Sequence, residues 1–181
     1  MEQDKNDIRL GRFLSLVLRH EPSAAGVTLD ANGWADVRQL LDGMNRTGRK
    51  IDMETLERVV RENNKTRYSF NAEHTRIRAN QGHSVAVDVQ LRAQTPPDIL
   101  YHGTASRFLD LIMREGLLPG SRQHVHLSAD IETATSVGGR HGKPVVLSVN
   151  AAAMTADGHT FWLSENQVWL CEAVPRQYLQ F

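Results

Sequence analysis

Cysteine is almost absent from this sequence, and long apolar stretches are missing. The 181 residues include one cysteine, Cys171, which cannot form an internal disulfide or build a cysteine-rich zinc site. We expect Cys171 to be a small buried hydrophobic residue in a reducing compartment. No apolar run approaches the roughly 20 residues of a membrane span. The polar segment MEQDKNDIRL at the start lacks the apolar core of a signal peptide. The sequence therefore predicts a cytoplasmic protein that does not contact a membrane.

Net charge and repeated segments are also lacking. The chain has 21 Lys and Arg residues against 21 Asp and Glu residues, which argues against a generic nucleic-acid-binding protein. No internal repeat or low-complexity tract is visible. Its 40% hydrophobic and 23% charged residues are typical of a globular protein. A chain of 181 residues can form one domain or two small ones.

The first half of the chain predicts three helices followed by a β-hairpin. Apolar residues recur at helical spacing in three segments, residues 7–19, 34–44 and 52–63. The first helix should end before Pro22, and Asp52 is the expected N-cap of the third. Alternating residues predict a hairpin over 67–79 and a further strand over 83–91. Three helices and a hairpin are typical of a winged-helix-like domain.

The second half mixes strands and helices. Pro96 and Pro97 are the strongest chain-breaking signal, so we expect domains over 1–94 and 95–181. The expected helices are 106–115 and 133–138, and the expected strands are 99–103, 124–128, 145–150, 160–164 and 168–174. The pattern predicts an α+β fold with a mainly antiparallel sheet.

Arginine, lysine and histidine occur among apolar and turn residues in five short segments. These are LRH at 18–20, KTRYSF at 65–70, RIRANQGHS at 76–84, YHGT at 101–104 and RQHVHLS at 122–128. A charge in such surroundings is costly unless an anion meets it, and guanidinium groups pair well with phosphate. The segments together predict a phosphate-binding cleft, and hence a nucleotide or nucleic-acid enzyme.

The YHGT segment ends a predicted strand and precedes a predicted helix. Gly103 would let the backbone approach a ligand, while Thr104 and His102 can bond to sugar hydroxyls. A turn with a helix cap is the alternative interpretation.

Spacing of two residues places two pairs of side chains on shared faces. His124 and His126 share a face if their segment is a strand, as do Lys65 and Arg67 if the hairpin begins at Lys65. The two histidines could bind a metal, but no third ligand is spaced to complete a site. We therefore expect no metal, one histidine in a ligand site and the other in a structural role.

Seven segments, in order along nearly the whole chain, resemble the RNA 2′-phosphotransferase family of the bacterial KptA type. They are LGRFLSLVLRH, GWADVRQLL, KTRYSF, RIRANQGHS, LYHGT, GLLPGSRQHVHLS and ENQVWL. RANQGHS is highly specific, and the ordered set makes a chance likeness implausible. The resemblance implies a winged-helix-like RNA-binding lobe over 1–94 and an ADP-ribosyltransferase-like NAD-binding lobe over 95–181.

The activity that the resemblance implies is NAD+-dependent removal of an internal RNA 2′-phosphate. The phosphate attacks the anomeric carbon of the nicotinamide ribose and expels nicotinamide. A neighbouring hydroxyl of the attached ADP-ribose then attacks phosphorus, which gives RNA with a 2′-OH and ADP-ribose 1″,2″-cyclic phosphate. NAD+ is consumed as co-substrate, in keeping with the lack of a Rossmann or P-loop motif. The expected partners are NAD+ and a tRNA-like RNA carrying a 2′-phosphate, and we expect a monomer.

The resemblance also implies three groups of site residues. The catalytic residues are Arg19, His20, Arg67 and Arg122. The NAD+-binding residues are His102, Gly103, Thr104, His126 and Ser128. The RNA-binding residues are Lys65, Arg78, Asn80, Gln81 and His83. An alternative for Asn80 and Gln81 is that they satisfy backbone groups in a tight turn.

Two functions from other classes stay open. One is a winged-helix nucleic-acid-binding regulator, which the glutamates of METLERVVRENN disfavour because they would face DNA phosphates. The other is an ADP-ribosyltransferase acting on nucleic-acid ends or on protein. Many protein-modifying members of that class use a Glu-x-Glu pair, and Glu165-Asn166-Gln167 lacks it.

Overall fold

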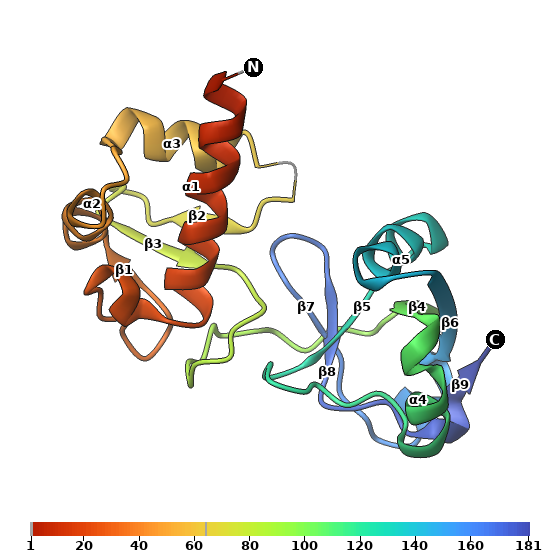
Figure 1. The fold of residues 1–181 in the computed structure, drawn as a ribbon. Helices are drawn as coiled ribbons and strands as arrows, with labels where there is room; N and C mark the ends of the chain where they lie inside the picture. The colour runs from red at the N-terminus through yellow and green to blue at the C-terminus, as the bar shows by residue number, and fades with distance from the viewer. Residues whose placement is uncertain (1, 64) are drawn as a thin grey trace. The chain divides into compact units, whose positions relative to one another are not determined.

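The computed structural model describes residues 2–63 and 65–181, with side chains described from residue 5 onward. The chain divides into two compact units, residues 1–90 and 91–181 (Figure 1). Both contain helices and antiparallel sheet, which confirms the α+β class. Among the described residues, no helix combines the length and apolar character needed to cross a membrane.

The first unit holds three α-helices and a three-stranded sheet. Its elements are α1 (Glu2–Arg19), the 3₁₀ turn η1 (Pro22–Ala25), β1 (Ala35–Asp36), α2 (Val37–Arg46), α3 (Met53–Arg61), β2 (Tyr68–Phe70) and β3 (Arg76–Ala79). Asp36 and Asp52 cap α2 and α3, because their carboxylates accept the backbone N–H groups of Gln39 and Thr55. The predicted third helix, its cap and the hairpin are confirmed.

The sheet of the first unit separates an apolar face from a polar one. Its strand order is β1–β3–β2, with Ala35 opposite Ile77 and Tyr68 opposite Ala79. These four side chains are buried in the core with the helices. Because side chains alternate along a strand, their neighbours lie on the other face of the sheet. We call this the outer face, and its residues are Trp34, Asp36, Ser69, Arg76 and Arg78.

Two predictions in the first unit are wrong. The predicted helix 34–44 begins only at Val37, since Trp34 bonds back to Asp30 and Ala35 pairs with Ile77 in the sheet. The predicted strand 83–91 is irregular. Its Ser84 and Val85 N–H groups bond to the Arg19 carbonyl and its Asp88 N–H group bonds to the Ala31 carbonyl, neither of which belongs to a strand.

The second unit contains two antiparallel three-stranded sheets. Their strand orders are β4–β6–β9 and β5–β8–β7. The strands are β4 (Ile99–Ala105), β5 (Val125–Leu127), β6 (Pro144–Asn150), β7 (Trp162–Leu163), β8 (Trp169–Cys171) and β9 (Leu179–Gln180). The helices are α4 (Leu109–Glu115), α5 (Ile131–Gly138) and α6 (Ala151–Ala156), with 3₁₀ turns η2 (Ser106–Phe108), η3 (Gly139–His141) and η4 (Arg176–Tyr178). The five predicted strands and the mainly antiparallel pairing are confirmed.

Three details of the second unit differ from prediction. Only Leu109–Glu115 of the predicted helix 106–115 is α-helical, and Ser106–Phe108 is a 3₁₀ turn. α6 and β9 were not predicted at all.

Cys171 is buried, and burial raises the pKa of its thiol to about 12, as expected of a structural cysteine.

Candidate functional site

Arg19 and His20 lie at the C-terminus of α1, as predicted. Arg19 is buried at 9% exposure, with its guanidinium carbon 6.0 Å from the centre of the Tyr68 ring. The Arg19 carbonyl accepts the N–H groups of Ser84 and Val85, and His20 Nδ1 lies 2.9 Å from Ser84 Oγ. The segment that follows the hairpin is therefore fastened to the end of α1.

His83 is buried near two arginines and a histidine that act on its pKa. Its side chain is 2% exposed. Burial, followed by the charges of Arg19, His20 and Arg78, lowers its pKa from 6.5 to about 4. His83 is thus a neutral imidazole near neutral pH, close to three cationic or ionisable groups. We call these four residues the α1–hairpin cluster, and such a concentration of cations favours an anionic ligand.

Asn80 ties Arg67 to this region. Its backbone N–H donates to the Arg67 carbonyl at 2.9 Å, and its side-chain amide donates to the Thr66 carbonyl at 2.7 Å. The Asn80 side chain thus satisfies a backbone carbonyl group, as the alternative interpretation expected for it. Its Oδ1 is buried and accepts no hydrogen bond from a described residue, so its remaining capacity is for a donor such as a hydroxyl.

The remaining predicted residues of the first unit are less enclosed. Arg67 and Gln81 are half-buried, and Lys65 is exposed in the turn before β2. The strand begins at Tyr68 and not at Lys65, so the condition under which Lys65 and Arg67 would share a strand face is not met. The Lys65 N–H donates to the Asn63 side chain at 3.2 Å.

Two histidines and a serine come together in the second unit. His102 Nδ1 donates to the His126 carbonyl at 3.1 Å, and His126 Nδ1 donates to the His124 carbonyl at 3.0 Å. Tyr101 and Ser128 exchange two backbone hydrogen bonds of 2.8 Å. Burial lowers the pKa of His102, while its bond to His126 raises it in part. His102 is therefore neutral, with Nε2 free to accept a proton donor.

Gly103 and Thr104 lie inside β4, and not in the turn that the sequence predicted. α5 packs on this strand. A Cβ added at Gly103 would come 1.7 Å from the Ala134 carbonyl oxygen of α5. The glycine thus permits close packing of helix on strand. Thr104 is buried at 6% exposure.

Arg122 lies in the loop before β5. Partial desolvation and the like charge of Arg140 lower its pKa. His124 precedes β5 and packs against Trp162, with 5.1 Å between ring centres. His126 and Trp162 both lie opposite Leu170, so the contact of His124 with Trp162 puts both histidines on one face of this sheet, as predicted, although the strand itself begins only at Val125. Among the described residues no three His, Cys, Asp or Glu side chains form a metal-binding group.

Two residues beside these clusters were not predicted. The positive charge of Arg140, 18 residues further along the chain, lowers the pKa of Arg122. No local sequence pattern indicates that the two residues interact. Trp34 stacks with Arg78, whose guanidinium carbon lies 4.6 Å from the ring centre. The sequence carries a signal for Trp34, namely a large aromatic residue in a loop of Asp, Asn and Gly.

Comparison with known proteins identifies the family. The family model for "RNA 2'-phosphotransferase, Tpt1 / KptA family" matches residues 5–173. A probable RNA 2′-phosphotransferase of Fusobacterium nucleatum is 52% identical, covering 97% of this chain and 99% of its own. Those of Hahella chejuensis and Agrobacterium fabrum are 54% and 55% identical, covering 97% and 93% of this chain and 95% and 90% of their own. The chain belongs to the RNA 2′-phosphotransferase family of the Tpt1/KptA type, a family of RNA-processing transferases.

Proposed function

We propose that this chain removes an internal 2′-phosphate from RNA and transfers it to the ADP-ribose part of NAD+. The products are RNA with a 2′-OH, nicotinamide and ADP-ribose 1″,2″-cyclic phosphate. Family membership supports the transferase activity and the RNA substrate. The use of NAD+ as co-substrate, the residue roles and a tRNA-like substrate in the cytoplasm are the finer parts of the proposal.

We assign RNA binding to residues 1–94, as a winged-helix-like lobe, and NAD+ binding to 95–181, as an ADP-ribosyltransferase-like lobe. Three helices with an antiparallel β1–β3–β2 sheet support the first assignment. Two small antiparallel sheets with α5 packed on β4 support the second.

The α1–hairpin cluster supports phosphate binding in the first unit. A phosphomonoester carries close to two negative charges near neutral pH. Arg19 and His20 would meet this group, and Arg67, held through Asn80, would join them. Guanidinium groups pair with phosphate oxygens in a fork geometry, so arginine suits this role better than lysine. Lys65, Gln81 and Arg78 would contact the rest of the RNA.

His102 supports the binding of a sugar in the second unit. Its Nδ1–H is engaged by the His126 carbonyl, and its neutral ring leaves Nε2 as an acceptor. A ribose hydroxyl can donate a hydrogen bond to this acceptor, whereas an ionised phosphate oxygen has no proton to donate. Thr104, His126 and Ser128 would line the same NAD+ site, with Gly103 supporting it through packing of α5.

The chemistry needs cations more than it needs a base. In the first step the phosphate is already an anion, so it attacks the anomeric carbon of NAD+ without proton removal. In the second step a ribose hydroxyl attacks phosphorus and loses its proton, the bond to the RNA 2′ oxygen breaks, and that oxygen takes up a proton to become the 2′-OH. Arg122 and the other arginines would stabilise the charge that develops on the phosphorus oxygens. His20 would act as a further cation or donate a proton to the departing oxygen.

The observation that carries the proposal is the attachment of the segment after the hairpin to Arg19 and His20 at the end of α1, with Arg19 and His83 both buried there. The test incubates the protein with NAD+ and a short RNA carrying an internal 2′-phosphate. Loss of the phosphate together with release of nicotinamide supports the proposal. A stable ADP-ribose adduct on RNA or protein would favour an ADP-ribosyltransferase. No turnover of NAD+ would favour a nucleic-acid-binding regulator.

Single substitutions test the catalytic assignment. Arg67→Ala and Arg122→Ala should abolish phosphate removal in folded protein, and Arg122→Ala should let the ADP-ribosylated RNA accumulate. Arg61→Ala is the matched control, because Arg61 is exposed at the end of α3 and its contact with Glu62 is long, at 3.9 Å. Near-normal rates in both site variants would overturn the assignment.

A further inference from the structure

Trp34 and Arg78 form a stacked pair on the outer face of the β1–β3–β2 sheet. Trp34 immediately precedes β1, Arg78 belongs to β3, and the guanidinium carbon lies 4.6 Å from the indole centre. Both side chains are half-buried, and the Arg78 Nε and Nη1 atoms are themselves buried. Ser69 pairs with Arg78 on the other side of β3. The face thus combines an aromatic surface with a cation.

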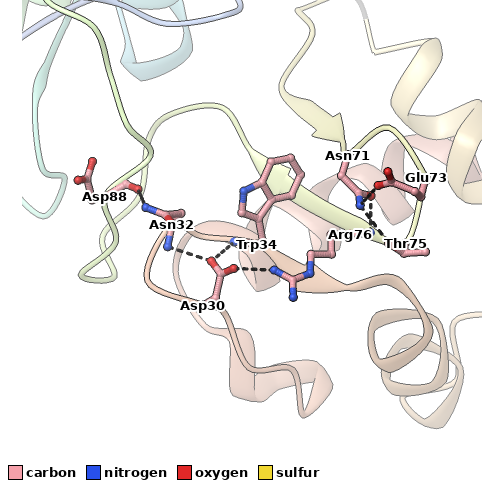
Figure 2. Close-up of polar contacts among 8 residues, drawn as sticks. All are labelled: Asp30, Asn32, Trp34, Asn71, Glu73, Thr75, Arg76 and Asp88. Atoms are coloured by element: carbon pink, nitrogen blue, oxygen red, sulfur yellow. Dashed lines mark hydrogen bonds and ion pairs between the residues drawn. The ribbon is translucent and has the colours of Figure 1, made fainter.

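The backbone around Trp34 is held in place before any ligand arrives. Asp30 Oδ1 accepts the N–H groups of Asn32 and Trp34, at 2.9 and 3.0 Å, and the Trp34 carbonyl accepts the Asp30 N–H. Asp30 Oδ2 accepts from Arg76 at 3.1 Å, and the Asn32 side chain donates to the Asp88 carbonyl at 2.7 Å. Figure 2 shows the indole pointing away from this network. A platform fixed in this way costs little entropy on binding.

The indole keeps an unused donor. None of the described residues accepts a hydrogen bond from the Trp34 ring N–H, although the side chain is half-buried. The indole N–H is therefore available to a ligand.

We propose that a nucleobase of the RNA substrate, next to the reacting phosphate, stacks on the Trp34–Arg78 pair. This inference rests on the proposed RNA substrate. Single-stranded RNA is commonly bound by stacking its bases on aromatic rings or arginine planes. Arg78 also contributes to the positive surroundings of His83, together with Arg19 and His20. A Cβ added at Gly33, the residue before Trp34, would lie 3.4 Å from His83 Nε2, so the platform adjoins the cations assigned to the phosphate. Trp34 then positions the RNA without touching the reacting atoms.

The test measures binding of a short 2′-phosphorylated RNA whose base beside the phosphate is 2-aminopurine, a base with fluorescence that stacking quenches. Wild-type protein should quench it, and Trp34→Ala should not. Trp34→Ala should weaken binding about 5- to 150-fold, the range found for loss of one base stack. Trp34→Phe keeps an aromatic ring and should recover most of this. In turnover, KM for RNA should rise while kcat changes little.

A base-deletion cycle separates stacking from a structural role. RNA that lacks the base should bind wild type as weakly as intact RNA binds Trp34→Ala, and the two losses should not add. Additive losses, or no loss with wild type at any nucleotide flanking the phosphate, would overturn the proposal. Arg49→Ala is the matched control, since Arg49 stacks on Phe13 in the same unit. Because the readout is binding, it holds whether or not the RNA is turned over. If wild type binds this RNA but fails to remove its phosphate, only the proposed function fails.

Discussion

His102 donates its Nδ1–H to the backbone carbonyl of His126 across 3.1 Å, which fixes the tautomer of the buried ring. Burial also lowers its pKa, so the ring is neutral at physiological pH. Nε2 can then only accept a hydrogen bond. This relationship makes His102 suitable for the role proposed for it, the acceptance of a hydrogen bond from a sugar hydroxyl of NAD+.

Two substitutions of His102 distinguish the contributions of its two ring nitrogens to NAD+ binding. Asparagine places an amide nitrogen near the Nδ1 position and keeps the donor to His126, but it lacks the outer acceptor. Glutamine places its amide near Nε2 and can keep that acceptor. His102→Asn should raise KM for NAD+ about 2- to 12-fold, the value of one hydrogen bond, and His102→Gln should raise it less. Initial rates at varied NAD+ measure this, and the reverse order would contradict the role of Nε2.

Gly103 should tolerate no side chain. An alanine Cβ there would lie 1.7 Å from the Ala134 carbonyl oxygen and 2.9 Å from the Gly138 nitrogen, so α5 would have to move off β4. Gly103→Ala should lower the free energy of unfolding by about 3 kcal/mol or more, as overpacking of a rigid contact does. Urea denaturation measures the change.

Gly139→Ala is the matched control for Gly103→Ala. Gly139 follows α5 directly, has a helical φ of −61°, and an added Cβ meets nothing within 4 Å. Its substitution should change stability by less than about 0.5 kcal/mol. A Gly103→Ala protein of normal stability that lost only NAD+ affinity would show that the glycine faces the ligand instead.

Local chemistry made much of the fold predictable. Asp52 was recognisable as a cap because a short acceptor before an amphipathic segment satisfies the first N–H groups of a helix. The hairpin of β2 and β3 followed from alternation and a polar turn. The predictions for residues 34–36 and 83–91 were wrong because the structure of both segments depends on residues distant in the sequence. Ala35 pairs with Ile77, and N–H groups of 83–91 bond to the carbonyl groups of Arg19 and Ala31.

The candidate site was predictable by residue type but not by detailed role. Cations among apolar residues indicated anion binding, and the structure groups Arg19, His20 and Arg78 around His83. The role of Gly103 could not be predicted, because a glycine is expected both where a helix packs closely on a strand and where a ligand approaches the backbone. Trp34 was assigned to a helix because its spacing from the apolar residues that follow fits a helix. The hydrogen bond between its N–H and Asp30, which holds it in a loop, could not be recognised from the sequence.

His83 should make the protein sensitive to acid. Its pKa is about 4 in the folded state and 6.5 when exposed, so between these values the unfolded chain binds more protons. Stability therefore rises with pH across this window and falls as pH drops from 6.5 to 4. The full loss is about 3 kcal/mol if the shift is fully expressed.

Substitution of His83 by Gln tests the direction and size of this effect. Urea denaturation between pH 4 and 7 should show a shallower loss of stability on acidification in His83→Gln than in wild type. Burial also lowers the pKa of His102 and of His124, so part of the slope should persist in the variant. His141→Gln, at an exposed position in η3, is the control. Identical pH slopes in wild type and His83→Gln would contradict the assignment.

Asp30 should stabilise the first unit mainly through the turn and less through its ion pair. One oxygen accepts the Asn32 and Trp34 N–H groups, and the other accepts from Arg76. The Asp30 and Arg76 side chains are 40% and 58% exposed, so the ion pair is worth about 0.2–1 kcal/mol. Asp30→Asn keeps an oxygen for the turn and should cost about as much as Arg76→Ala. Asp30→Ala loses both and should cost about 2 kcal/mol or more.

These three variants also connect the turn to the proposed base stack. If Asp30 holds Trp34 in position, Asp30→Ala should weaken quenching of the 2-aminopurine RNA, and Asp30→Asn should leave it near wild type. Denaturation and quenching measured on the same preparations separate stability from positioning. Equal destabilisation by Asp30→Asn and Asp30→Ala would show that the carboxylate charge, and not the turn, dominates. Full quenching by Asp30→Ala would show that Trp34 stays in place without this support, because its stack with Arg78 is then sufficient to hold it.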